Sequence, residues 1–144
     1  YQEGYDITGV DSSINMIKQA ITLMPKSKFI NKNFEDSLIE LQDELFDVII
    51  FTYSVHHISN SEQNTLLKLL SNKLSSNGVI IIGDVMTKTN EELMELSNVS
   101  GDEWDDEEYY PTLENYDNDV LNESYDIEFH KITFCSGIII LKKK

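Results

Sequence analysis

Residues 46–58 read FDVIIFTYSVHHI, in which a largely apolar, β-branched run leads into polar residues and two histidines. Such a run is typical of a strand that lies inside a parallel sheet. Similar runs stand at residues 6–10 (DITGV), 27–31 (SKFIN) and 78–85 (GVIIIGDV). All but the last precede a polar or amphipathic stretch of helical length. This alternation predicts an α/β fold in which helices cover both faces of the sheet.

Capping residues mark the helices between these strands. One of the serines after Asp11 can cap a helix that runs to Met24. Ser59 and Glu62 stand at capping-box spacing before a stripe of leucines, and we expect that helix to end at a left-handed cap on Gly78. A second capping box at residues 89–92 predicts a further helix.

The C-terminal third begins with a change of composition. Residues 101–111 (GDEWDDEEYYP) contain six carboxylates and three aromatic rings without apolar periodicity, which predicts a loop or a lid. One more helix is expected within residues 112–125. Residues 126–134 and 136–144 then predict two strands, and the short CSG turn between them permits only an antiparallel hairpin. Cys135, in this turn, is expected to be a buried thiol.

The length and charge of the chain limit its number of domains and its kinds of partner. A chain of 144 residues with 40% hydrophobic content predicts one domain. Its formal charge of -15 disfavours nucleic acid and anionic membranes as partners and favours a small-molecule substrate. A single cysteine excludes an internal disulfide, and the apolar runs are shorter than the roughly 20 residues of a membrane span. We therefore expect a cytoplasmic protein.

These motifs in their order resemble the class I S-adenosylmethionine-dependent methyltransferases, and more narrowly their small, uncharacterised bacterial members. The resemblance rests on GVDSSINMIKQA, FDVIIFTYSVHHI, LSSNGVIIIGDV and the terminal hairpin, and it runs from about Tyr5 to Lys142. It implies a Rossmann-like sheet with the strand order 3-2-1-4-5-7-6, in which only strand 7 is antiparallel. It also implies S-adenosylmethionine as the cofactor.

The resemblance assigns the cofactor's nucleoside to the first third of the chain. Asp11, with Ser12 beside it, matches the acid that accepts hydrogen bonds from the ribose hydroxyls, although Asp11 can instead merely cap the next helix. Met16 matches an apolar residue near the adenine, and its alternative is ordinary core. Asn33 or Asp36 can bond the adenine amino group. Phe34 is expected to form a wall of the adenine site or to be core.

The end of the run at residues 46–52 matches the methionine side of the cofactor. Thr52, Tyr53 and Ser54 are expected to contact it, while His57 matches a common family histidine near the acceptor. His57 and Tyr53 are the catalytic candidates, although methyl transfer can proceed by positioning alone. A structural histidine is the alternative for His57. We expect no metal site, because adjacent histidines point apart and no cysteine or carboxylate stands at ligand spacing.

Two further residues are acceptor-site candidates. Asp84 follows an apolar strand and can either contact the acceptor or cap the next turn. Trp104 can form a lid over the acceptor, or the loop's aromatic rings can fold back on the domain. The acidic loop lacks the ligand spacing of a calcium loop.

The family's first strand and glycine-rich turn have no counterpart in the ten residues before Asp11. We therefore expect an N-terminally truncated methyltransferase domain that binds S-adenosylmethionine weakly or not at all. Two strand edges would then be unpaired and an apolar face open, which permits a dimer through an edge. A non-catalytic Rossmann-like binding module is the alternative function. A nicotinamide-dependent oxidoreductase is disfavoured by the terminal hairpin.

Overall fold

The computed structural model describes residues 2–144, which separate into two compact units, one up to Glu44 and one from Leu45 to Lys144. The first unit consists of β1 (Thr8–Val10), α1 (Ile14–Leu23), β2 (Lys28–Ile30) and α2 (Phe34–Glu40). Its two strands are parallel, and Gly9 faces Phe29 across them. A Cβ atom at Gly9 would lie 2.7 Å from the Phe29 ring, so this close approach requires glycine. The predicted alternation of strands and helices is confirmed here.

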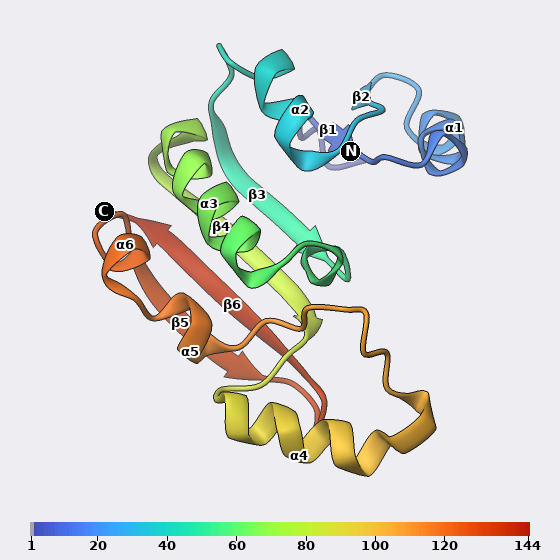
Figure 1. The fold of residues 1–144 in the computed structure, drawn as a ribbon. Coiled ribbons are helices and arrows are strands. Elements are labelled where there is room, and N and C mark those ends of the chain that lie inside the picture. Colours follow the sequence, from blue (N-terminus) through green and yellow to red (C-terminus); the bar gives the residue numbers. More distant parts are fainter. Residues whose placement is uncertain (1) are drawn as a thin grey trace. The chain divides into compact units, whose positions relative to one another are not determined.

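The second unit contains a four-stranded mixed sheet. Its elements are β3 (Phe46–Thr52), a 3-10 helix (Val55–His57), α3 (Asn60–Leu70), a 3-10 turn (Ser71–Lys73), β4 (Leu74–Val85), α4 (Asn90–Ser100), a 3-10 turn (Gly101–Glu103), α5 (Leu113–Tyr116), α6 (Asp119–Asn122), β5 (Tyr125–Lys131) and β6 (Ser136–Lys143). The strand order is β3-β4-β6-β5, and β6 alone runs against its neighbours, as its arrowhead shows in Figure 1. This order corresponds to strands 4-5-7-6 of the expected sheet, so the mostly parallel sheet with an antiparallel terminal hairpin is confirmed.

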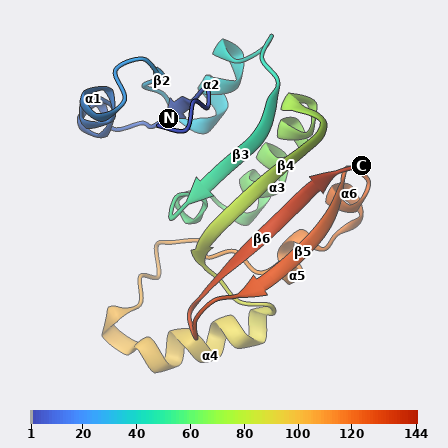
Figure 2. The same ribbon diagram turned by 180° about the vertical axis from the view of Figure 1, so that it is seen from behind.

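Helices lie over only one face of this sheet. α3, α5 and α6 cover the face turned to the viewer in Figure 1, and Figure 2 shows the opposite face without a helix of this unit. The covered face forms the core, where Ile80, Ile82 and Leu141 are 0% exposed. On β3, Val48 and Ile50 are exposed. The helices that precede β3 in the chain, α1 and α2, belong to the other unit.

The outer strands of this sheet, β3 and β5, each pair on one side only within the described residues. Among the described residues β3 pairs with β4 and has no partner on its other side. The unpaired side of β3 thus lies on a strand with exposed apolar side chains, Val48 and Ile50.

The predicted end of the leucine-striped helix is wrong. α3 ends at Leu70, and residues 74–78 already belong to β4. Gly78 is not a left-handed cap but a strand residue at an irregularity between β3 and β4. A Cβ atom there would lie 2.8 Å from the Leu74 Cβ and 3.0 Å from the Phe46 carbonyl oxygen. Close backbone approach, rather than a helix end, explains this glycine.

Two other expectations need correction. The helix expected within residues 112–125 is divided into α5 and α6, because Asn118 caps a new helix with its side chain. Cys135 is half-buried rather than buried, since it lies in the surface turn between β5 and β6. Within the part of the chain that the structure describes, no helix is long and apolar enough to cross a bilayer.

The capping box of α3 gives a testable pH dependence. The Ser59 hydroxyl and N–H donate to Glu62 Oε2 at 2.5 and 2.8 Å. Both hydrogen bonds lower the pKa of Glu62, and the hydrogen bond from the hydroxyl has the larger effect. A carboxyl whose pKa is lowered by folding stabilises the folded chain above its unfolded-state pKa, and this contribution is lost as the pH falls through the folded-state pKa. Thermal unfolding is therefore expected to depend less on pH between about 6 and about 3 in E62Q than in the wild type. The control is Glu91→Gln, which removes an exposed acid from the first turn of α4. Equal pH dependence in wild type and E62Q would contradict this role.

Candidate active site

The loop after β3 and the end of β4 lie side by side. Thr52, the last residue of β3, is in parallel register with Gly83 of β4, and Asp84 follows directly. The 3-10 helix that carries both loop histidines begins just beyond β3. Open α/β sheets bind ligands at the carboxyl ends of such parallel strands. A ligand site is therefore expected at this edge of the second unit.

His56 and Asp84 form a close pair at this edge. His56 Nδ1 lies 2.6 Å from Asp84 Oδ1, and their side chains are 13% and 0% exposed. The same oxygen accepts a hydrogen bond from the Val85 N–H at 2.8 Å, while Oδ2 has no partner within residues 2–144. Because an ionised carboxylate only accepts hydrogen bonds, His56 donates to it through Nδ1, and in a neutral imidazole the lone pair is then on Nε2. Asp84 thus accepts from the backbone of the following turn, which was one of the two predicted roles, and it also orients His56, which the sequence did not reveal.

Glu108 reaches both histidines from the acidic loop. His57 Nδ1 lies 3.1 Å from each carboxylate oxygen of Glu108, and His56 Nε2 lies 3.9 Å from Oε2. The centroids of the two imidazole rings are 4.3 Å apart. The expectation that adjacent histidines point apart is wrong here, because the 3-10 turn brings both rings to one carboxylate.

Aromatic rings of the acidic loop lie beside this cluster. The Trp104 and Tyr110 ring centroids are 4.4 Å apart, and the Tyr110 centroid lies 5.8 Å from that of His56. Burial, together with the negative charges of Asp105, Glu108 and Asp84, raises the pKa of Tyr110. The loop therefore folds back on the domain, as one of the two alternatives for Trp104 requires, and this places Trp104 near the histidines.

A buried glutamine of α3 fixes the two segments that carry the cluster. Gln63 is 1% exposed, and its Nε2 lies 2.8–3.0 Å from the carbonyl oxygens of Val55, Ile58 and Tyr109. Its Oε1 accepts a hydrogen bond from the Tyr116 hydroxyl at 2.6 Å, and burial raises the pKa of that hydroxyl. Gln63 thus ties the histidine loop to the acidic loop through their backbones.

In the first unit, Asp11 lies directly after β1. Its Oδ1 accepts a hydrogen bond from the Ser13 N–H at 2.7 Å, and no hydrogen bond to Oδ2 occurs in the described chain. The Asn31 amide donates to the carbonyl oxygens of Asp11 and Ser12 at 2.9 Å each, which fixes the turn. Asp11 therefore supports the start of α1 through one carboxylate oxygen.

The other predicted nucleoside contacts have different surroundings. Ser12 is exposed, and Met16 is 52% exposed on the first turn of α1, so Met16 is not ordinary core. Asn33 caps α2, because its Oδ1 accepts a hydrogen bond from the Asp36 N–H at 2.8 Å. Phe34, the first residue of α2, is half-buried.

Comparison with known families decides the identity of this fold. Residues 1–119 match the family model described as a methyltransferase domain. The chain belongs to the methyltransferase domain family. The matched residues run through both units and end before β5.

Two known relatives of this methyltransferase domain align with it over only part of their own length. An uncharacterized methyltransferase from Alkaliphilus oremlandii is 28% identical over 97 residues, which cover 67% of this chain and 44% of the relative. An uncharacterized methyltransferase from Bacillus licheniformis is 26% identical over 137 residues, which cover 89% of this chain and 63% of the relative. The chain thus spans less than two thirds of the length of either relative.

A solved structure supports the fold of the methyltransferase domain. A SAM-dependent methyltransferase from Archaeoglobus fulgidus superposes with a TM-score of 0.71 over 99% of this chain and 78% of its own, at 18% identity. The similarity at this identity shows a shared fold, and it agrees with the strand order described above.

One of the three residues expected to contact the methionine end of the cofactor, Tyr53, has a strained backbone in this methyltransferase domain. Thr52 ends β3, Ser54 precedes the 3-10 helix, and between them Tyr53 has a φ of 48°. Its ring is exposed, and its N–H donates to the Gly83 carbonyl oxygen at 2.9 Å. Left-handed backbone is costly for a bulky residue and is commonest at functional sites.

Because of this strain, a glycine and a β-branched residue at position 53 are expected to affect stability differently. Tyr53→Gly is expected to change the free energy of unfolding by less than about 1 kcal/mol, because glycine adopts positive φ without cost. Tyr53→Val is expected to lower it by about 1–2 kcal/mol, because a β-branched residue does not. Urea denaturation measures both. Equal destabilisation by the two substitutions would mean that backbone strain at this position is unimportant.

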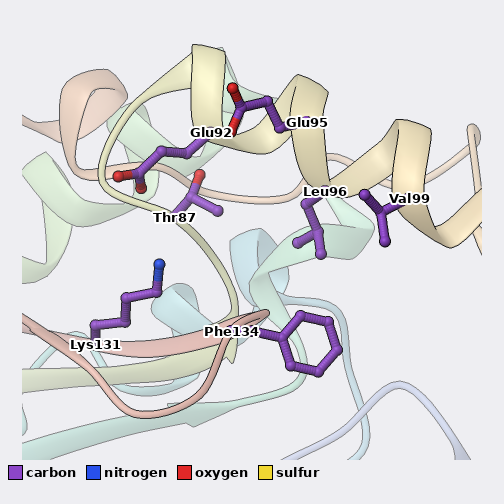
Figure 3. A pocket seen from close by; sticks show the side chains of 7 residues that line it. All are labelled: Thr87, Glu92, Glu95, Leu96, Val99, Lys131 and Phe134. Carbon is purple, nitrogen blue, oxygen red and sulfur yellow. The ribbon is translucent and has the colours of Figure 1, made fainter.

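One pocket of the methyltransferase domain lies away from the histidine cluster. It has a volume of about 260 Å³ and is lined by Thr87, Glu92, Glu95, Leu96, Val99, Lys131 and Phe134. Figure 3 shows Lys131 and Phe134, from the β5–β6 hairpin, facing side chains of α4. No residue of the cluster lines this pocket, so we do not assign it to the candidate active site.

The structure thus brings together the three predicted acceptor-site residues and adds residues that were not predicted. His57, Asp84 and Trp104 come together through His56, Glu108 and Tyr110. Sequence reasoning missed Gln63, although it occupies the first position of an i, i+3, i+4, i+7 stripe whose other members are buried leucines. A polar residue on such a stripe is a recognisable signal of a buried hydrogen-bonding side chain.

Proposed function

We propose that this chain carries residues for S-adenosylmethionine-dependent methyl transfer to a small-molecule acceptor. The proposal rests on the strand order β3-β4-β6-β5, with an antiparallel β6, in a chain that belongs to the methyltransferase domain family. The Archaeoglobus protein of the same fold is described as SAM-dependent. A formal charge of -15 favours a small acceptor over a polyanion.

The residues of the first unit fit the nucleoside of this cofactor. Asp11 has a carboxylate oxygen without a protein hydrogen bond in the described chain, and a ribose hydroxyl is a donor that suits it. The exposed side chain of Met16 is available to an adenine ring. Asn33 and the half-buried Phe34 are proposed to contact the same base, and exposed Ser12 lies next to Asp11. These five residues are the proposed nucleoside contacts.

The residues of the second unit are proposed to hold the methionine end and the acceptor. Thr52, Tyr53 and Ser54 take the first role, since they occupy the carboxyl end of β3. His57, Asp84 and Trp104 take the second. S-adenosylmethionine supplies a methyl group on a sulfonium sulfur, and the chain's own contribution is to align an acceptor atom with it. No residue is assigned as a base.

Methyl transfer can be tested with the protein that the complete reading frame encodes. It is incubated with S-adenosylmethionine and a panel of small hydroxyl, thiol and amine compounds, and S-adenosylhomocysteine is quantified by mass spectrometry. We expect release above the acceptor-free background with at least one class. Binding of S-adenosylhomocysteine without turnover on any class would favour the non-catalytic binding module instead.

A further inference from the structure

We propose that His56, His57 and Glu108 form a binding site for a divalent transition metal of the zinc type. One ligand atom from each residue lies within 4.8 Å of those from the other two. The sequence spacing had argued against a metal, because Glu108 stands 51 residues after His57 and belongs to another loop. Folding supplies the carboxylate that spacing alone did not show.

The donor atoms select the class of metal. Two imidazole nitrogens and one carboxylate oxygen are the ligand set of open zinc sites, in which a fourth position is left for water or a substrate atom. Magnesium and calcium prefer oxygen ligands throughout. The site therefore fits Zn²⁺ and comparable ions better than the hard cations.

A buried carboxylate prepares His56 for this role. The Asp84 side chain is 0% exposed and accepts a hydrogen bond from His56 Nδ1 at 2.6 Å, so in the neutral imidazole the lone pair is on Nε2, which lies 3.9 Å from Glu108 Oε2. Metal-binding histidines usually donate their other ring nitrogen to a carboxylate in this way, which fixes both the tautomer and the ring. The arrangement matches a carboxylate–histidine–metal unit.

The other two ligands can close around an ion. Ligand atoms around tetrahedral zinc are about 3.3 Å apart, as bond lengths of roughly 2.0–2.1 Å require. His57 Nδ1 and Glu108 are already 3.1 Å apart, so the main adjustment is toward His56. The side chain of His57 is 61% exposed and can therefore adjust to an ion, while that of Glu108 is 22% exposed. The surrounding acidic loop attracts cations.

The test is Zn²⁺ titration of the 144-residue chain by calorimetry, with Co²⁺ absorption as a second readout because its visible spectrum reports tetrahedral nitrogen and oxygen ligands. We expect one ion per chain. His56→Ala, His57→Ala and Glu108→Gln should each weaken binding at least about 10-fold, and Asp84→Asn by about 10- to 100-fold through loss of orientation. His57 and Glu108 are surface residues, so their variants should keep the wild-type circular dichroism.

Matched controls separate this site from the general acidity of the chain. His130, which lies 3.7 Å from Glu128, and Glu107, next to Glu108, supply the same chemical groups elsewhere. His130→Ala and Glu107→Gln should bind Zn²⁺ like the wild type. The proposal is overturned if the wild type does not bind Zn²⁺, or if His57→Ala and Glu108→Gln bind it as the wild type does. Neither readout depends on methyl transfer, so failure of the proposed function leaves this test intact.

Discussion

Asp11→Asn is expected to weaken the binding of S-adenosylhomocysteine by about 10- to 100-fold, which corresponds to the loss of charge-assisted hydrogen bonds to the ribose. Asparagine keeps an oxygen that can accept from the Ser13 N–H, the contact that Asp11 Oδ1 makes at 2.7 Å. The turn before α1 should therefore persist, and the substitution should remove only the charge and one acceptor. Calorimetric titration of the protein from the complete reading frame measures the effect.

The control for this substitution is the residue that caps the helix. Ser13 accepts a hydrogen bond from the Met16 N–H and is the N-cap of α1. Ser13→Ala should lower the free energy of unfolding by about 1 kcal/mol and change ligand affinity little. If Asp11→Asn leaves affinity unchanged and lowers stability as Ser13→Ala does, Asp11 is a capping residue and not a ribose ligand.

Gln63→Leu is expected to lower the free energy of unfolding by about 3–5 kcal/mol. The substitution preserves the approximate volume of the side chain but removes the amide that lies 2.9 and 2.8 Å from the carbonyl oxygens of Ile58 and Tyr109. The Val55 carbonyl keeps the Ile58 N–H as a donor at 3.2 Å. The substitution also removes the acceptor of the buried Tyr116 hydroxyl. Each unsatisfied buried group costs about 1–3 kcal/mol. Urea denaturation followed by circular dichroism gives the value.

Tyr116→Phe is the matched control for the glutamine. It removes one hydrogen bond of the same network and leaves the amide contacts to the three carbonyl oxygens in place. We expect a loss of about 1–2 kcal/mol. A loss from Gln63→Leu no larger than that from Tyr116→Phe would show that the amide does not hold the two loops together.

The strands of this fold could be predicted from sequence because their signal is local. The runs at residues 46–52 and 78–85 are apolar and β-branched, and they occupy β3 and β4. The terminal hairpin followed from the shortness of its turn. Ser59 and Glu62 likewise identified the start of α3, since a capping box is contained within four residues.

The errors arose where tertiary contacts override a local pattern. The SSNG segment has the composition of a helix end, but its residues continue β4 because pairing with β3 begins as early as Leu74. Gly78 is explained by the nearby Phe46 carbonyl oxygen, a contact that no local pattern contains. The division of the expected helix at Asn118 shows that a side-chain cap can end a helix whose apolar spacing continues.

The candidate site was only partly predictable for the same reason. Its residues come from segments far apart in the chain: Asp84 lies 28 residues from His56, and Glu108 lies 51 residues from His57. Position after a strand was enough to select Asp84, whereas His57 was selected by the family resemblance. The choice between His56 and His57, and the part played by Glu108, depended on how the loops fold together.

The central claim is that this chain takes part in binding S-adenosylmethionine, and titration of S-adenosylhomocysteine into the protein from the complete reading frame tests it most directly. We expect saturable binding at one site per chain with a Kd of about 1–100 μM, or about -8 to -5 kcal/mol. S-adenosylmethionine should displace the ligand, and NADH should not. Absence of saturable binding, or displacement by NADH, would contradict the claim.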